Sequence, residues 1–338
     1  MTAAPLYPQR RSRPRFQLKG QLAGFTLSPI GWLAYTSGRI RRAAATPAAC
    51  LVGEFTRILA GANTWQGKGF NQIWRPFPDP TKKQDRFLEL NSTIETLEFG
   101  DSLGQIPNRG LFGQPDITLF GLTYLQQISD ANVKGPNGQP AGLHVEPGIW
   151  LNVPATTDPQ DPATVARLAS IPHGTTIVVQ GAGSVVAGPP EIADNDIFPF
   201  PIGQPSKPIT DFPEQNLSIP TDFRSKPDDI RGITQEMVNN PNSVLQTVIR
   251  EQRITSTTVL QISSANRTPP PSSGGGTSNI AFLGPNANAV EIDAIFWIET
   301  VQTGDTVTHQ LQYTQRVLLN FDGLSWPHVS VATLTKVR

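Results

Sequence analysis

Near its end the chain reads Gly323-Leu324-Ser325-Trp326-Pro327-His328-Val329-Ser330-Val331-Ala332, and this stretch decides the fold. Its glycine favours a turn, and its apolar end favours a β-strand. Strand patterns also cover residues 290–301 and 309–321, and short turns separate them. The C-terminal part of the chain is therefore expected to be a run of antiparallel strands.

The strand pattern, in which apolar and polar residues alternate, continues upstream of this run. It covers residues 61–75, 87–99, 117–128, 142–153, 165–171, 173–181, 252–264 and 280–282. The series has no alternation of strand and helix and no internal repeat. We therefore predict an all-β fold, a single antiparallel barrel of about ten strands of the calycin or lipocalin kind. Closure of a barrel removes the exposed edges that such strands would otherwise present.

Long insertions are expected in the loops of this barrel, at residues 100–116, 187–243 and 265–279. The second of them holds nine prolines between residues 187 and 227 and has no regular period, so it is interpreted as an insertion and not as a domain. One or two short helices are expected. One covers residues 52–59, and the other begins at Pro241, which suits a first helical position.

The composition limits the classes of function. The 338 residues include 32 prolines and 29 glycines, and only 16% are charged, which favours a turn-rich β fold over a helical bundle. Residues 1–53 carry eight basic residues and no acidic one, which leaves 19 basic against 27 acidic residues in the rest of the chain. This acidic body argues against nucleic acid as the main partner. The single cysteine, Cys50, excludes a disulfide framework, and no apolar run is long enough for a membrane-spanning helix.

Residues 1–50 lack periodicity and are expected to form an extension, with the barrel over residues 51–338. The arginines and serines of the extension, and its lack of acidic residues, resemble an organelle transit peptide. We favour the alternatives, which are a disordered or loosely docked extension and an upstream start codon. The predicted location is therefore the cytoplasm, with organelle import through the basic N-terminus as the alternative.

The chain has four histidines, His144, His173, His309 and His328, and His328 is the candidate ligand for a metal or haem iron. His328 follows a proline where a turn enters a strand, so its backbone is fixed before its ring is oriented, as an axial ligand requires. The alternative for His328 is a histidine packed in the core or at the barrel rim. His309 follows a turn and is expected to be solvated.

His144 and Glu146 are two residues apart on one predicted strand and therefore share a face. We interpret them as a structural hydrogen-bonding pair. The alternatives are a polar pair that points into the barrel, or a metal pair. His173 stands between a proline and a glycine at a strand entrance, where it either lines a pocket or caps a loop.

Three segments, in order, resemble the nitrobindin family of small β-barrel haem proteins. Residues 61–69 are similar to that family's opening Gly-x-Trp-x-Gly-x-Gly strand, with one extra residue before the tryptophan. Residues 143–150 are similar to its His-x-Glu-x-Gly-aromatic strand. Residues 324–334 resemble its terminal Leu-x-Pro-His-Leu-x-Ala-x-Leu strand, in which Trp326 is an additional bulky residue near the ligand position.

The resemblance implies a haem b cofactor with His328 as the iron ligand, and with His144, His173 and Trp326 as further residues of the cofactor site. It implies binding of a small molecule such as nitric oxide, or a haem-dependent peroxynitrite isomerase activity. The long insertions leave the physiological ligand open. Two alternatives remain, a lipocalin-like carrier of an apolar small molecule without haem, and a structural or interaction barrel.

Overall fold

A computed structural model describes residues 63–337 of the chain, apart from residues 80, 82–84, 225 and 266–270. The expected N-terminal extension, residues 1–50, and the expected helix at residues 52–59 lie outside the described residues. In the part of the chain that is described, no helix is long and apolar enough to cross a membrane.

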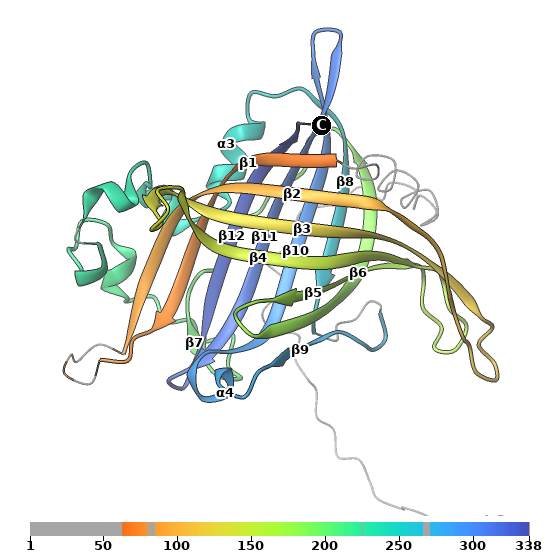
Figure 1. The fold of residues 1–338 in the computed structure, drawn as a ribbon, viewed down its shortest axis with the longest axis horizontal. Coiled ribbons are helices and arrows are strands. Elements are labelled where there is room, and N and C mark those ends of the chain that lie inside the picture. Colours follow the sequence, from red (N-terminus) through yellow and green to blue (C-terminus); the bar gives the residue numbers. More distant parts are fainter. Residues whose placement is uncertain (1–62, 80, 82–84, 225, 266–270, 338) are drawn as a thin grey trace, which may run out of the picture. The chain divides into compact units, whose positions relative to one another are not determined.

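Ten strands, each antiparallel to its neighbours, close into one barrel (Figure 1). They follow one another around the barrel in chain order, and the last of them pairs with the first. The predicted all-β antiparallel barrel of about ten strands is therefore confirmed. The strands are β1 (Asn63–Pro76), β2 (Arg86–Asn108), β3 (Ile117–Lys134), β4 (Pro140–Val153), β5 (Thr164–Ile171), β6 (Thr175–Ala187), β8 (Ile254–Ser263), β10 (Asn288–Thr303), β11 (Thr306–Phe321) and β12 (Leu324–Lys336).

The remaining elements are short. Strand β7 (Phe200–Pro201) pairs with β12, and strand β9 (Gly276–Asn279) pairs with β6. The α-helices are α2 (Gln235–Asn239), α3 (Ser243–Ile249) and α4 (Leu283–Asn286), and the 3-10 turns are η2 (Pro213–Gln215), η3 (Asp222–Arg224) and η4 (Pro227–Ile230). The helix expected at Pro241 is α3, which begins two residues later than predicted.

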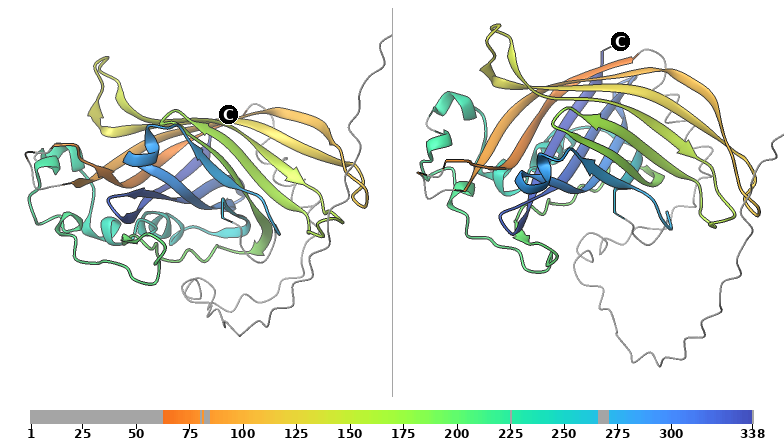
Figure 2. Two further views of the ribbon diagram at one scale, coloured as in Figure 1. Left: turned by 90° about the horizontal axis from the view of Figure 1, so that it is seen from below. Right: turned by 60° about the horizontal axis from the view of Figure 1, so that its bottom comes forward.

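The segment at residues 100–116, expected as a loop, is mostly strand. Strands β2 and β3 stay paired out to Asn108 and Ile117, and their register shifts on either side of Ser102. Such bulges add twist without ending the pairing. Only residues 109–116 connect the two strands, which extend together beyond the rest of the sheet (Figures 1 and 2).

The prediction of a strand at residues 280–282 is wrong. The pairing with β6 ends at Asn279, and the next residues turn into α4, since the Leu283 amide donates to the Ile280 carbonyl over 3.0 Å. The turn places Ile280 beside the hairpin between β5 and β6, where its amide donates to the Gly174 carbonyl over 2.9 Å.

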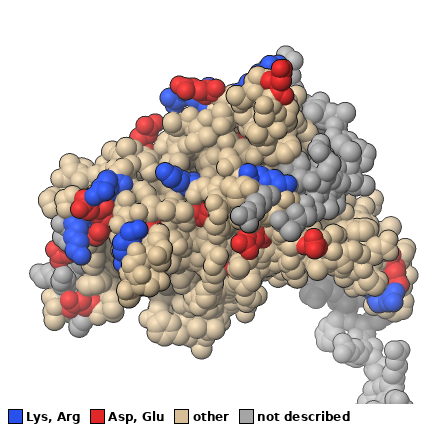
Figure 3. All heavy atoms as spheres, turned by 45° about the horizontal axis from the view of Figure 1, so that its top comes forward, with Lys and Arg blue, Asp and Glu red and all other residues tan. Residues whose placement is uncertain are grey.

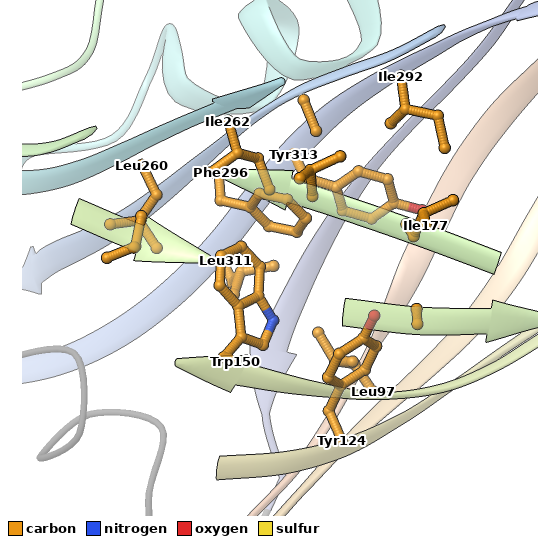
Figure 4. Close-up of a cluster of buried hydrophobic side chains, with 14 of the residues drawn as sticks. Leu97, Tyr124, Trp150, Ile177, Leu260, Ile262, Ile292, Phe296, Leu311 and Tyr313 are labelled. Atoms are coloured by element: carbon orange, nitrogen blue, oxygen red, sulfur yellow. The ribbon is translucent and has the colours of Figure 1, made fainter. Parts of the chain in front are cut away.

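Apolar side chains pack inside the barrel from Leu334, near the end of β12, to Val317, which pairs with His328 near the start of β12 (Figure 4). The Phe296 ring lies edge-on to Trp150 at 5.1 Å and stacks on Tyr313 at 5.5 Å. Other members of this inner core include Trp65, Leu97, Leu260, Ile298, Leu311 and Leu334. These residues lie on alternate positions of their strands, as a filled small barrel requires.

A second core lies on the outer face of the barrel. Trp74 of β1 and Trp326 of β12 are fully buried there, with ring centroids 5.2 Å apart. The insertion at residues 187–243 covers them, because Phe212 packs on both rings. Its other contributions to this outer core are Ile192, Ile197, Ile233 and Val238. The insertion is thus a layer over the outer wall of β1, β2 and β12.

Gly67 of β1 has no room for a side chain beside β12. A Cβ atom added at this position would lie 1.9 Å from the Thr333 carbonyl oxygen. We expect Gly67→Ala to destabilise the fold by about 1–3 kcal/mol, because strand β12 must move to admit the methyl group. Gly142→Ala, in β4, is the matched control, since a Cβ atom there meets nothing within 4 Å. Urea unfolding would contradict this account if the two variants had equal midpoints.

Charged side chains of both signs are interspersed on the face of the molecule in Figure 3. Among the described residues on that face, no extended field of one sign is present. The charged groups that stand out in this structure are instead those buried inside the barrel.

Candidate functional site

Ionisable side chains are buried in the middle of the barrel interior. Glu95 of β2, Glu146 of β4 and Arg167 of β5 are each no more than 1% exposed. Side chains alternate between the two faces of a strand, so the same rule that places Leu97 and Trp150 in the inner core points Glu95 and Glu146 inward. The barrel therefore holds buried charged side chains among its apolar ones.

Glu146 is the centre of the first group of contacts among these side chains. Its Oε1 accepts hydrogen bonds from the Tyr124 hydroxyl and from Nη2 of Arg167. Arg167 also donates from Nε to the Tyr124 hydroxyl and from Nη1 to Oε1 of Gln315, both over 2.7 Å. The second carboxylate oxygen of Glu146 faces Nε2 of His144 at 3.3 Å. All three nitrogens of the guanidinium group are used, so the pair is rigidly held.

The pKa values in this group follow from burial and from the ion pair. Burial raises the pKa of Glu146, but the charge of Arg167, with help from His144, outweighs this and lowers the pKa to about 2. Burial likewise opposes the charge of Arg167, yet Glu146 raises its pKa above the ordinary value. Burial raises the pKa of Tyr124. Glu146 and Arg167 are therefore charged, and Tyr124 is a neutral donor.

Glu95 is the centre of the second group. Its Oε2 accepts a hydrogen bond from the Tyr313 hydroxyl over 2.6 Å, and its Oε1 accepts one from the Thr93 hydroxyl over 2.8 Å. Gln126 donates to both Tyr313, over 3.0 Å, and Glu95, over 3.4 Å. Burial raises the pKa of Glu95, since no cation compensates for it at hydrogen-bonding distance.

Three of the four histidines lie near one another, toward the end of the barrel where β12 begins. We call these residues, His144, His173 and His328, the histidine cluster. The rings of His144 and His173 are 5.7 Å apart between centroids. His328 lies within electrostatic reach of both rings. The three residues come from β4, from the turn between β5 and β6, and from β12, so closure of the barrel brings them together.

His328 faces the barrel interior from the start of β12. Its partners across the two neighbouring strands are Ile73 and Val317, and directly paired residues lie on the same face of a sheet. Burial, followed by the positive charge that His144, His173 and Arg75 would carry, lowers the pKa of His328 to about 3. Its ring is therefore neutral, and Nε2 lies 3.5 Å from the Ser330 hydroxyl.

His173 is exposed at the mouth of the barrel, in a turn whose next residue, Gly174, has a φ of 106°. Burial and then the charge of His144 lower the pKa of His173, while a hydrogen bond to the Leu143 carbonyl opposes this. The bond to Leu143 attaches the turn to the strand that carries His144. His173 thus lies beside His144 and ties the turn between β5 and β6 to β4, the second of the two roles left open by the sequence.

An ion pair and two asparagines complete the interior near His328. Arg75 Nη1 lies 2.7 Å from Glu89 Oε2. Asn71 and Asn91 are cross-strand partners, and both are at least 95% buried. Asn91 donates to an oxygen of buried Asp130 over 2.8 Å. Polar side chains therefore gather beside His328 on β1 and β2, while Val317 and Ile292 of the inner core lie on its other side.

Trp326 does not join the histidine cluster. Its indole is buried in the outer core between Trp74, Phe212 and Phe321, and its Nε1 donates to the Phe321 carbonyl over 3.0 Å. His309 pairs across the sheet with Thr300 at the far end of β11 from the cluster. Trp326 is thus placed away from the cluster by the fold, and His309, which was expected to be solvated, is half-buried within β11.

His144 and Glu146 form the hydrogen-bonding pair that the sequence predicts, and the pair points into the barrel. Within the described residues, no group of three or more histidine, cysteine or acidic side chains is arranged to hold a metal ion.

Sequence reasoning missed the residues that position this pair, namely Arg167, Tyr124, Gln126, Glu95 and Gln315. One signal was available for Arg167, which is the single charged residue in the apolar run of residues 165–171. A charge at an inward position of a strand has to find a partner inside the barrel. The sequence does not say which residue on another strand that partner is.

Comparison with protein families, with curated proteins and with solved structures finds no match to this chain.

Proposed function

We propose that the barrel binds haem b at the histidine cluster, with His328 as the iron ligand. The convergence of three of the four histidines inside one end of the barrel carries this proposal. A buried imidazole that makes only a 3.5 Å contact to Ser330 contributes little to the fold, which favours a role in binding.

The residues around His328 fit the chemistry of a haem. Ile73 and Val317 flank it with apolar surface suited to a porphyrin face. Arg75, at the mouth and half exposed, offers a positive charge for a propionate. The hydroxyl of Ser330 lies 3.5 Å from Nε2 of His328, where it could turn toward the ring as a partner for a ligating histidine.

Haem held by one neutral imidazole would supply an iron with a free coordination position for a diatomic ligand such as nitric oxide. The peroxynitrite isomerase activity implied by the nitrobindin resemblance belongs to the same proposal. The chain's own residues would hold the cofactor through His328, with Ser330 beside that ring, and His144 and His173 would be polar groups beside the bound molecule.

A carrier of an apolar molecule without haem is the second candidate. The apolar inner core favours it, but the buried charges of Glu146 and Arg167 and the carboxyl group of Glu95 lie within the same interior. Displacing these groups from their partners would cost several kcal/mol. A purely apolar ligand therefore fits this interior less well than one with polar edges.

Titration of the full-length protein with ferric haem tests the proposal. We expect a Soret band to develop, and we expect His328→Ala to weaken haem binding by about 100-fold or more, because the only bond to iron is lost. His144→Ala should retain the Soret band, and His309→Ala, outside the cluster, should bind haem as the native chain does.

Two results would count against haem. One is the failure of any Soret band to develop, and the other is a band that persists unchanged in His328→Ala. Uptake of a fluorescent fatty acid by the haem-free protein, without a Soret band on haem addition, would favour the carrier. Binding of neither would leave a structural or interaction barrel.

A further inference from the structure

The bond between His144 and Glu146 fixes which nitrogen of the imidazole ring carries the hydrogen. Nε2 of His144 faces the Glu146 carboxylate at 3.3 Å. An ionised carboxylate can only accept a hydrogen bond, so Nε2 is the donor. In the neutral ring the other nitrogen, Nδ1, then carries a lone pair and acts as an acceptor. Among the described residues, none donates to it at hydrogen-bonding distance.

Glu146 is itself held so that it cannot turn away from His144. Its other oxygen is taken by Arg167 and Tyr124, and Arg167 is anchored in turn to Gln315. This chain of contacts crosses the barrel through β3, β4, β5 and β11. The side chain of His144 is 17% exposed, so the ring is partly buried and part of its surface is open to a bound molecule.

A second unused acceptor faces the same interior. Nδ2 of Asn91 donates to Asp130, which fixes the orientation of the amide and leaves Oδ1 as an acceptor. This Oδ1 is buried and has no partner among the described residues. Asn91 is paired with Asn71, which is paired with Ser330, the neighbour of His328. A buried acceptor without a donor is costly, so a bound molecule that supplies the donor would be stabilised here.

We infer that His144 accepts a hydrogen bond from the molecule bound in the histidine cluster, so that the cluster selects ligands that present a hydroxyl or N–H group. The inference rests on the proposed function in one respect, that a small molecule binds in the cluster. It makes His144 a specificity-determining residue and Glu146, which acts through it, a positioning residue. It extends the sequence-based interpretation of the two as a purely structural pair.

Imidazole and 1-methylimidazole are suitable probes, because they share a ring and only the first has an N–H donor. Binding of each to the full-length, haem-free chain is followed by NMR at about pH 8. We expect imidazole to bind roughly tenfold more tightly than 1-methylimidazole. We expect His144→Phe, which keeps an aromatic ring, to abolish this preference, and His309→Gln, outside the cluster, to retain it.

The tautomer of His144 provides a test that needs no variant. Long-range ¹H–¹⁵N correlation spectra of the native chain should show a hydrogen on Nε2 and none on Nδ1 of this residue. The inference is overturned if the tautomer is the opposite one, if neither probe binds, if both bind equally, or if the preference survives in His144→Phe. Failure of haem to bind, with the preference intact, would reject the haem proposal and leave this inference standing.

Discussion

Replacement of Arg167 by Met is expected to lower the free energy of unfolding by about 3–5 kcal/mol, the cost of leaving a buried charge without its partner. Arg167 is 1% exposed and Glu146 is fully buried. Met keeps much of the volume of the side chain but removes three donors, so the Glu146 carboxylate loses the guanidinium group that is bonded to it. Chemical denaturation of the full-length protein measures the effect.

The double variant Glu146→Gln/Arg167→Met separates charge from packing. We expect it to recover at least half of the lost stability, because a neutral amide is far less costly to bury alone than a carboxylate. A double variant as unstable as Arg167→Met would show that shape, and not the ion pair, determines the loss. Arg109→Met, which breaks the exposed pair with Asp116, is the control and should change little.

The Glu146–Arg167 pair also predicts a loss of stability in acid. The pKa of Glu146 is about 2 in the folded protein and ordinarily 4.5, so the folded state favours the ionised form. The associated stability, about 3 kcal/mol, is fully present above pH 4.5 and is lost as pH falls toward 2. In Arg167→Met this acid dependence should shrink or reverse.

Glu299→Gln is expected to stabilise the protein at pH 8 by up to about 3 kcal/mol and to have little effect at pH 4. Glu299 of β10 is fully buried, and burial raises its pKa from 4.5 to about 7, although a 2.7 Å hydrogen bond from Gln310 opposes the rise. The folded state thus favours the protonated form. Stability is highest below pH 4.5 with respect to this group and falls as pH rises through 7, where the buried carboxyl must ionise.

The comparison of unfolding free energies at the two pH values tests this assignment. Glu98→Gln, at an exposed position of β2, is the matched control and should show no such pH-dependent gain. Equal stabilisation by Glu299→Gln at pH 4 and pH 8 would mean that ionisation of Glu299 is not the cause. Glu146 and Glu299 act in opposite directions, so together they favour maximal stability near pH 4.5, with a loss toward pH 2 from Glu146 and a loss toward pH 7 from Glu299.

Most of the barrel could be predicted from the sequence because a strand with one buried face carries its own signal. The predicted strands at residues 87–99, 142–153 and 309–321 lie within β2, β4 and β11. The predictions that failed concern the ends of strands and the turns between them. Within the segment at residues 100–116, strand β2 stays paired with β3 as far as Asn108 through bulges, which have no clear local pattern in the sequence. The segment 280–282 is apolar, but it leaves the sheet for a helical turn.

The candidate site was predicted less completely. His144 with Glu146, and His328 on the last strand, were found from short-range spacing. Trp326 was expected beside His328 because it is close in sequence, but it packs on the outer face of the barrel with Trp74. Proximity along the chain is a poor guide at the start of a strand, where the side-chain directions are set by packing against other segments.

The sequence by itself determined the strands, their antiparallel order and the identity of the four histidines, because alternation and turn residues act within a few positions. Only the tertiary structure decided that three of those histidines meet, that Arg167 pairs with Glu146, and that the insertion at residues 187–243 covers the outer wall. The physical reason is closure of the sheet. It brings together side chains from strands far apart in the chain, and the burial of each charge then selects the partner that compensates for it.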